Sequence, residues 1–171
     1  MGTIIYAGDT VLTHNHFDPT LLQNADFVEF TNYWGNWTRI EMDDIDRRFR
    51  DNPGTQLLKL PARVNLGGTQ ATLGNPHTLS PGDWTQVVYY DEGADQMRVL
   101  MRSVRRLGEW QGEPIAIFKN HSDNPAEIID HGDSGGGVFK EGRLVANIWW
   151  IRPGWWLGPP IFASALLPDG L

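Results

Sequence analysis

The stretch His131-Gly132-Asp133-Ser134-Gly135-Gly136-Gly137-Val138-Phe139 decides which fold the sequence predicts. Four glycines surround a single serine, and an aspartate precedes it. Because glycine permits positive φ and close approach of the backbone, such a loop can direct its N–H groups toward one point beside the serine hydroxyl. Acyl transfer requires this combination of a nucleophile and hydrogen-bond donors for the oxyanion. A plain glycine-rich turn is the alternative that this stretch leaves open.

Size and composition indicate one globular domain that is rich in β-structure. The chain has 171 residues, of which 40% are hydrophobic and 20% are charged, as in ordinary globular proteins. With 19 glycines and 11 prolines, there is little room for long helices. We therefore expect a single domain that spans residues 1–171.

Charge and hydropathy exclude several classes of partner. The net charge of −7 argues against a nucleic-acid-binding surface, and no apolar run approaches the roughly 20 residues of a membrane span.

The sequence contains no cysteine, which excludes disulfides and thiolate metal sites. No signal peptide is visible. The expected location is cytoplasmic, or secreted or periplasmic if the chain is a shortened form of an exported protein. The oligomeric state stays open.

Short strand candidates separated by turns form two sets along the chain. The first set comprises 3–7, 10–13, 27–31, 37–42 and 57–60. The second comprises 84–90, 97–107, 115–118, 137–139, 144–151 and 161–165. One short helix is predicted at 43–49. This pattern predicts an all-β fold of two antiparallel six-stranded barrels with compact loops. Residues 1–66 would form the first barrel, 67–82 a connector and 83–171 the second barrel.

The order of the histidines separates two kinds of serine hydrolase. Gly132 to Gly136 also matches the G-x-S-x-G pattern of the α/β-hydrolases, whose base histidine follows the serine. All five histidines precede Ser134: His14, His16, His77, His121 and His131. The chain therefore fits only the order His, acid, Ser, which is that of the chymotrypsin-like proteases.

Four segments resemble the trypsin/chymotrypsin-like serine protease family. Val11 to Phe17 resembles the motif V-L-T-A-A-H-C, with His16 at the base position, and Gly132 to Gly136 is identical to G-D-S-G-G. Leu144 to Trp150 resembles the strand L-V-G-I-V-S-W that follows the nucleophile, and Leu57 to Leu60 resembles the end of D-I-A-L-L-K-L. These matches occur in the family's order, and the chain is similar to the compact, cysteine-free bacterial members.

The resemblance implies a role for each matched residue. Ser134 would be the nucleophile of a serine endopeptidase, and His16 its general base. The backbone N–H groups of Gly132 and Ser134 would form the oxyanion hole. Asp133 would brace the loop from inside the protein. In the animal enzymes this aspartate pairs with a free N-terminus, whereas we expect Asp133 to have another partner.

The acid of the expected triad has no matching residue. Alignment on Leu57 to Leu60 puts Gly54 at the position of the family's catalytic aspartate. The nearest carboxylate is Asp51, in a turn that contains Pro53 and Gly54, and we predict that Asp51 takes this role. The alternatives are Asn52, Asp43, Asp44, Asp46 or no acid at all.

The same alignment predicts the substrate pocket. Its base would lie near Ile128, where trypsin-type members carry a carboxylate, and its wall near Trp149, Trp150 and Ile151. A bulky side chain at Ile151 would narrow the pocket. We therefore expect either a polypeptide substrate with a small or aliphatic residue before the scissile bond, or a blocked pocket.

Two other functions are compatible with parts of the sequence. The string His14-Asn15-His16-Phe17-Asp18 is an H-x-H-x-D pattern, in which two histidines on one strand face could chelate a metal ion. A non-catalytic binding module of the protease fold would explain Gly54 and Ile151. The favoured interpretation, a serine endopeptidase, requires neither a metal nor a cofactor.

Overall fold

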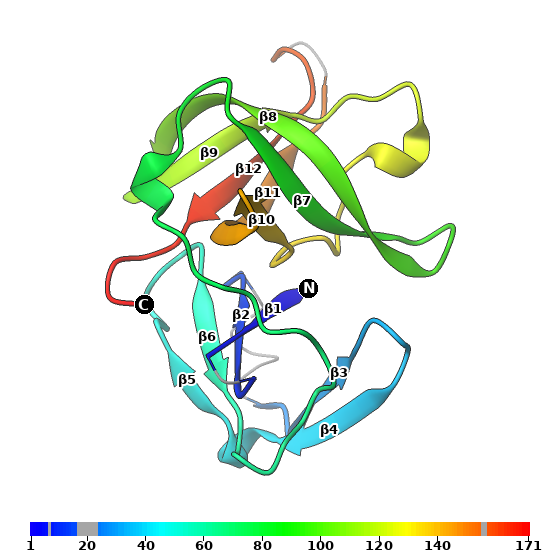
Figure 1. Ribbon diagram of the computed structural model, residues 1–171, viewed down its shortest axis with the longest axis vertical. Helices are drawn as coiled ribbons and strands as arrows, with labels where there is room; N and C mark the ends of the chain where they lie inside the picture. Colours follow the sequence, from blue (N-terminus) through cyan, green and yellow to red (C-terminus); the bar gives the residue numbers. More distant parts are fainter. Residues whose placement is uncertain (7, 17–23, 155–156) are drawn as a thin grey trace.

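The computed structural model describes residues 1–6, 8–16, 24–154 and 157–171. Strands dominate these residues, and they form two lobes joined by a long connector (Figure 1). The first lobe contains β1 (Gly2–Ile5), β2 (Thr10–Thr13), β3 (Phe27–Thr31), β4 (Trp37–Glu41), β5 (Asp46–Arg48) and β6 (Gln56–Lys59). The second contains β7 (Trp84–Asp91), β8 (Gln96–Trp110), β9 (Glu113–Lys119), β10 (Gly137–Lys140), β11 (Arg143–Arg152) and β12 (Ile161–Leu166).

The second lobe is a closed antiparallel barrel. Its strands follow the order β10-β11-β12-β9-β8-β7. Side chains alternate between the two faces of a strand, and β7 shows this as alternating exposed and buried positions along most of its length. The interior is apolar, with the rings of Phe118 and Phe162 stacked at a centroid distance of 4.8 Å. This barrel is the rigid support for the loop that carries Ser134.

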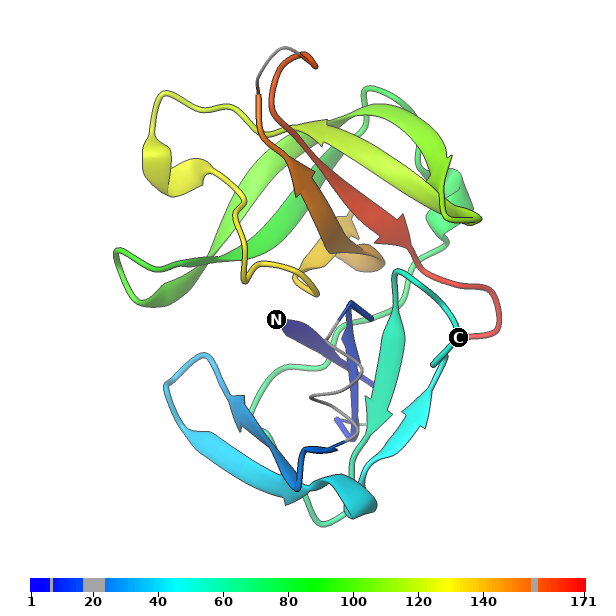
Figure 2. The same ribbon diagram turned by 180° about the vertical axis from the view of Figure 1, so that it is seen from behind.

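The first lobe consists of a four-stranded sheet and a hairpin. The sheet has the order β1-β2-β6-β5, and β3 pairs with β4. The connector bridges these two parts. The N–H of Ala71 donates to the carbonyl of Ile4 at the edge of β1 (2.8 Å), and the side-chain amide of Asn32, at the hairpin turn, donates to the carbonyl of Leu66 (3.0 Å). Figures 1 and 2 show the connector passing between β1 and the hairpin.

The expected all-β, double-barrel fold class is confirmed, but the predicted helix at 43–49 is wrong. Residues Met42–Asp44 form a single 3-10 turn, and Asp46–Arg48 form β5. Strand β5 pairs with β6, for example Arg47 with Leu58. Backbone pairing with an existing sheet therefore outweighs the weak local preference of these residues for a helix.

Side chains from both lobes meet beside β11. Asn147, which is fully buried, accepts a hydrogen bond from the hydroxyl of Thr55 (2.7 Å) and donates to the carbonyl of Gly54 (3.1 Å). One apolar cluster also contains residues of both lobes, including Leu12, Leu57 and Leu144. These contacts fix the start of β6 against the second barrel.

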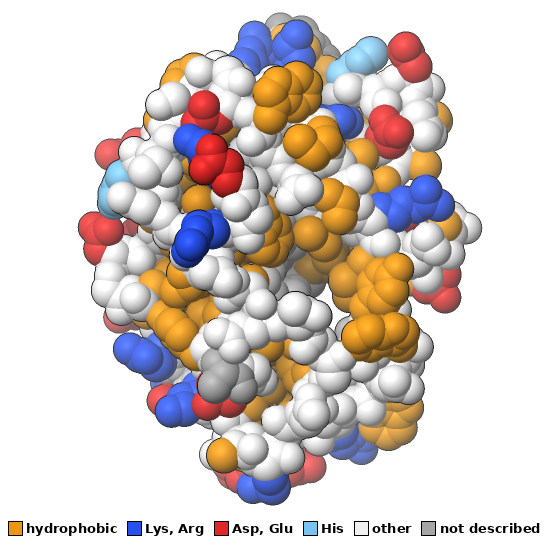
Figure 3. Space-filling model, viewed as in Figure 1, with side chains coloured by type: hydrophobic (Ala, Val, Ile, Leu, Met, Phe, Trp, Pro, Cys, Tyr) orange, Lys and Arg blue, Asp and Glu red, His pale blue; other side chains and the backbone are white. Residues whose placement is uncertain are grey.

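Several large apolar side chains stay on the surface. At the tip of the β3–β4 hairpin, Tyr33, Trp34 and Trp37 are each more than half exposed, at 62%, 64% and 65%. Hydrophobic side chains are visible over this hairpin on the right of Figure 3. None of the described residues forms a helix that is long and apolar enough to cross a membrane.

Candidate active site

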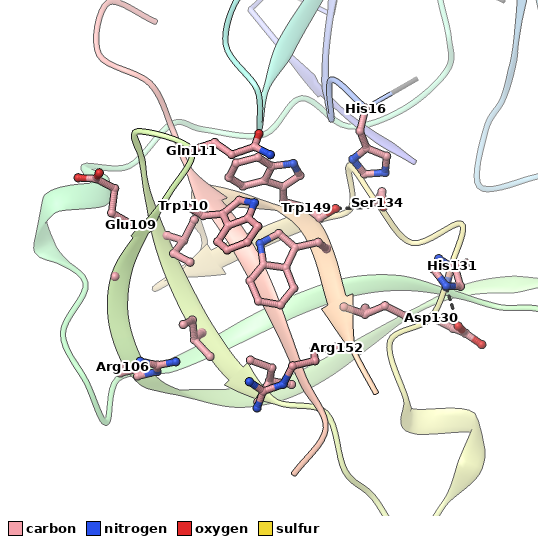
Figure 4. Close-up of a pocket in the computed structure, with 16 residues that line it drawn as sticks. His16, Arg106, Glu109, Trp110, Gln111, Asp130, His131, Ser134, Trp149 and Arg152 are labelled. Atoms are coloured by element: carbon pink, nitrogen blue, oxygen red, sulfur yellow. Dashed lines mark hydrogen bonds between the residues drawn. The ribbon is translucent and has the colours of Figure 1, made fainter. Parts of the chain in front are cut away.

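Ser134 and His16 line the same cavity at the junction of the two lobes. The cavity has a volume of about 840 Å³. Ser134 comes from the loop before β10, and His16 follows β2 of the first lobe. In Figure 4 the imidazole of His16 lies close to Ser134. The fold thus brings together the two residues that the sequence predicts as nucleophile and base.

The loop before β10 leaves two of its N–H groups free. The N–H groups of Asp133, Gly135 and Gly136 donate to the carbonyls of Asp130, Ile148 and Asp133, respectively. Within the described part of the chain, the N–H groups of Gly132 and Ser134 donate to no acceptor. Gly132 has φ +99°, a conformation that suits glycine and not residues with a Cβ. The two free donors are those expected for the oxyanion hole.

The hydroxyl of Ser134 is half-buried at the edge of the cavity. It donates a long hydrogen bond to the carbonyl of Trp149 (3.5 Å). Proton transfer to His16 therefore requires the hydroxyl to rotate toward the imidazole. Such contacts are often long in free enzymes and shorten when substrate binds.

Two histidines with closely spaced, tilted rings follow β2. The ring of the buried His14 lies 4.0 Å from the ring of His16, and its Nδ1 accepts a hydrogen bond from the backbone N–H of His16 (3.4 Å). Burial lowers the pKa of His14 from 6.5 to about 3, and the nearby charges of His16 and the Met1 amino group contribute. Partial burial also lowers the pKa of His16, with further contributions from the Met1 amino group and His131. Both rings are therefore neutral at pH 7.

The low pKa of His14 predicts that the protein loses stability in mild acid. Between pH 3 and 6.5 the unfolded chain binds a proton at His14 that the folded chain does not, with its folded pKa of about 3. Stability therefore falls as the pH decreases through this window. The expected loss from this group is on the order of 4 kcal/mol.

Urea unfolding of the wild type and of His14→Gln between pH 4 and pH 7 would measure this effect. The variant lacks the titrating group and should lose less stability over that range. An identical pH dependence in the two proteins would contradict the assignment to His14.

Among the described residues, no carboxylate takes the position of the triad acid. Gly54 is buried, and a Cβ built on it would lie 2.6 Å from the Cβ of Ala165 and 3.2 Å from two carbons of the Trp149 indole. The Trp149 side chain is only 4% exposed. The indole thus occupies the space beside Gly54, where an acidic side chain would have to lie.

The structure does not bring the predicted acid, Asp51, into the cavity. Asp51 is exposed in the turn before β6 and is not among the groups that shift the pKa of His16. The alternatives also lie elsewhere. Asn52 accepts hydrogen bonds from the N–H groups of Gly54 and Thr55. Asp44 forms an ion pair with Arg63, and neither Asp43 nor Asp46 lines the cavity.

Asp133 braces the loop through its buried carboxylate. It accepts hydrogen bonds from the N–H groups of Tyr90 (2.7 Å) and Asp130 (2.8 Å). Burial raises its pKa, while these hydrogen bonds and the nearby Met1 amino group act in the opposite direction. The Met1 amino group itself donates to the carbonyl of Ser134 (2.6 Å). The hydrogen-bond partners of Asp133 are thus backbone donors, and the charge of the Met1 amino group acts on the same carboxylate.

The cavity wall includes three of the four predicted pocket residues. Trp149, Trp150 and Ile151 line it, whereas Ile128 does not and is 37% exposed outside it.

The β8–β9 hairpin forms another wall of the cavity, which the sequence analysis did not predict. Its lining residues are Arg106, Gly108, Glu109, Trp110 and Gln111. The only available signal was the Gln111-Gly112 turn that follows the exposed Trp110. The indole rings of Trp110 and Trp150 pack against each other, with their centroids 5.7 Å apart.

The metal-site alternative gains no support from the described residues. Among positions 1–6, 8–16, 24–154 and 157–171, no group of three or more potential ligands lies together. Asp18, the third member of the H-x-H-x-D pattern, is outside the described residues.

Known structures share the fold of this chain. No family model and no curated protein matches its sequence. The HtrA-type protease AlgW, solved with a decapeptide, superposes with a TM-score of 0.66 and 19% identity over 96% of this chain and 47% of the AlgW chain. The chain therefore spans about half the length of that protease.

Two further structures show the range of proteins that have this fold. The tobacco etch virus protease complexed with product gives a TM-score of 0.63 and 10% identity over 99% of this chain and 66% of the other. A scabies mite inactivated protease paralogue gives a TM-score of 0.63 and 15% identity over 95% of this chain and 81% of the other. The chain therefore has the chymotrypsin-like double-barrel fold of the trypsin-like serine proteases.

Proposed function

We propose that the chain is a serine endopeptidase that uses Ser134 and His16 as a dyad. The observation that carries the proposal is the pair of free N–H groups, on Gly132 and Ser134, beside a serine hydroxyl that shares a cavity with a neutral histidine. The AlgW and tobacco etch virus protease structures, which contain a bound peptide and a product, support a polypeptide substrate.

The reaction follows from the chemistry of these groups. His16 takes the proton of the Ser134 hydroxyl as its oxygen attacks the carbonyl carbon of the peptide. The N–H groups of Gly132 and Ser134 stabilise the oxyanion that forms. His16 then gives the proton to the leaving amine, and water hydrolyses the acyl-enzyme by the same steps. Ile151, on the cavity wall, favours a small or aliphatic residue before the scissile bond.

The base can be tested with a peptide hydrolysis assay. We expect His16→Ala to reduce kcat/KM by about 10²–10⁴-fold, the usual contribution of a general base. His77→Ala is the matched control, because His77 is exposed, does not line the cavity and pairs with Asp169. Equal losses in the two variants would contradict the role of His16.

The pH dependence of hydrolysis gives an independent prediction. The base must be neutral to accept the Ser134 proton, and the pKa of His16 is lowered. We therefore expect kcat/KM to stay constant from about pH 8 down to about pH 6.5, the ordinary pKa of histidine, and to fall only below it. A rate that is halved already above about pH 6.5 would contradict this assignment.

A peptide-binding module without catalysis is the second candidate function. The Trp149 indole beside Gly54 favours it, because an imidazole without a carboxylate partner is a weaker base. The similarity to an inactivated protease paralogue shows that the fold also occurs in such proteins. Peptide binding without hydrolysis would support this candidate.

A further inference from the structure

Two arginines lie at the end of the cavity that is remote from Ser134. Arg106 belongs to β8 and Arg152 to β11, and both line the cavity. In Figure 4 both guanidinium groups lie on the opposite side of the view from His16 and Ser134. Among the described residues, neither guanidinium has a carboxylate partner within 4.0 Å. This end of the cavity therefore carries uncompensated positive charge.

The guanidinium of Arg152 retains an unused donor. Its Nη2 donates to the carbonyl of Pro159 (3.3 Å), but its Nε is buried and has no hydrogen-bond partner in the described part of the chain. The indole Nε1 of Trp150 is likewise buried and unpartnered. Buried donors are nearly always satisfied, and an unsatisfied one is destabilising. Since neither atom is exposed to solvent, a bound acceptor would pair with them after a shift of the two side chains toward the cavity.

Strand register shows how the two arginines flank one apolar surface. Arg106 is paired with Ile117, and Ile117 is paired with Ala163 of β12. Arg152 is paired with Ile161 of the same strand β12. Ile117 and Ile161 both line the cavity between the arginines. An acceptor at this site would be held over an apolar floor, where charge interactions are stronger than in water.

The two carboxylates of the cavity do not neutralise the arginines. Glu109 and Asp130 point to opposite edges of the view in Figure 4, away from both guanidinium groups. Asp130 accepts a hydrogen bond from the N–H of His131 (2.7 Å). The overall charge of −7 has little influence here, because charges beyond about 8 Å are largely screened at physiological salt.

We propose that the site between Arg106 and Arg152 binds an aspartate or glutamate side chain of the peptide, on the N-terminal side of the scissile bond. This inference rests on the proposed function and names its substrate class. A carboxylate accepts hydrogen bonds from guanidinium groups in a favourable geometry. The wall of Trp150 and Ile151 leads from Ser134 to this site. Because the same wall forms the pocket proposed for the residue before the scissile bond, we assign the acidic residue to the upstream side of that residue.

Binding to the Ser134→Ala variant tests the inference without turnover. Fluorescence anisotropy would compare labelled peptides that carry Glu or Gln at each of the three positions upstream of an alanine. We expect the best Glu peptide to bind about 10-fold more tightly than its Gln counterpart, because charged hydrogen bonds are about twice as strong as neutral ones. Adding Arg152→Glu to the Ser134→Ala variant should reverse the charge preference. A peptide with Lys at the same position should then bind more tightly than the Glu peptide. Arg106→Glu is the second test variant, and Arg105→Glu, outside the cavity, is the control.

The outcomes distinguish the inference from the proposed function. Equal binding of Glu and Gln peptides at every position, or no binding of either, overturns the inference. Loss of the preference in Arg105→Glu, but not in Arg152→Glu or Arg106→Glu, also overturns it. A Glu preference that depends on the two cavity arginines supports the inference even if the wild type cleaves none of the peptides, an outcome that would contradict only the proposed endopeptidase.

Discussion

Replacing Ser134 with alanine should reduce peptide hydrolysis by about 10³-fold or more, because the variant lacks the attacking oxygen. The fold should be retained, since the Ser134 hydroxyl makes a single long hydrogen bond within the described part of the chain, to the carbonyl of Trp149 (3.5 Å). Steady-state kinetics with a peptide substrate would measure the loss, and a thermal melt would verify the fold.

Ser103→Ala is a matched control for this variant. Ser103 is half-buried on β8 of the same barrel and does not line the cavity. Its replacement should leave hydrolysis unchanged. If Ser134→Ala kept the wild-type rate while still folding, Ser134 would not be the nucleophile.

A paired substitution at Gly54 and Trp149 should convert the dyad into a triad. Gly54→Asp alone would place a Cβ 3.2 Å from carbons of the indole, with an unpaired carboxylate buried beside it, and should cost about 3–5 kcal/mol. Trp149→Ser alone would leave a cavity and should cost a similar amount, about 3–5 kcal/mol. Together they should offset each other, because the carboxylate could occupy the space left by the indole and orient His16.

A double-mutant cycle would measure this coupling in both stability and rate. We expect the double variant to be more stable than the sum of the single effects implies, and to exceed the wild-type kcat/KM by about 10-fold or more. Ala165, whose Cβ would lie 2.6 Å from the new Cβ, must shift as the indole is removed. A stable and more active Gly54→Asp single variant would show that the indole does not exclude the acid.

Most of the fold could be predicted from the sequence because its strands have strong local signals. Trp84–Asp91 alternates between exposed and buried positions along most of its length, and Ile161–Leu166 is a short, almost entirely apolar run that is buried throughout. Strand β5 could not be found in this way, because Asp46–Arg48 is polar and extended only through pairing with β6. The bridging role of the connector was also hidden, since it depends on single hydrogen bonds to Ile4 and from Asn32.

The candidate site was predictable only where its residues lie in a contiguous motif. Gly132 to Gly136 and the strand before His16 carry such signals. The relation between Gly54 and Trp149 carries none, because these residues are far apart in sequence and meet only where β6 packs on β11. The arginines of the β8 and β11 strands are hidden for the same reason: the barrel brings them to one cavity.

Labelling with a fluorophosphonate probe tests the central claim most directly, because the probe reacts only with a serine that its surroundings activate. Intact mass and peptide mapping would locate the adduct in the wild type, in Ser134→Ala and in His16→Ala. The dyad predicts one adduct, on Ser134 of the wild type, with little or none in either variant. A wild type that stays unlabelled, or that is labelled equally after His16→Ala, would contradict it.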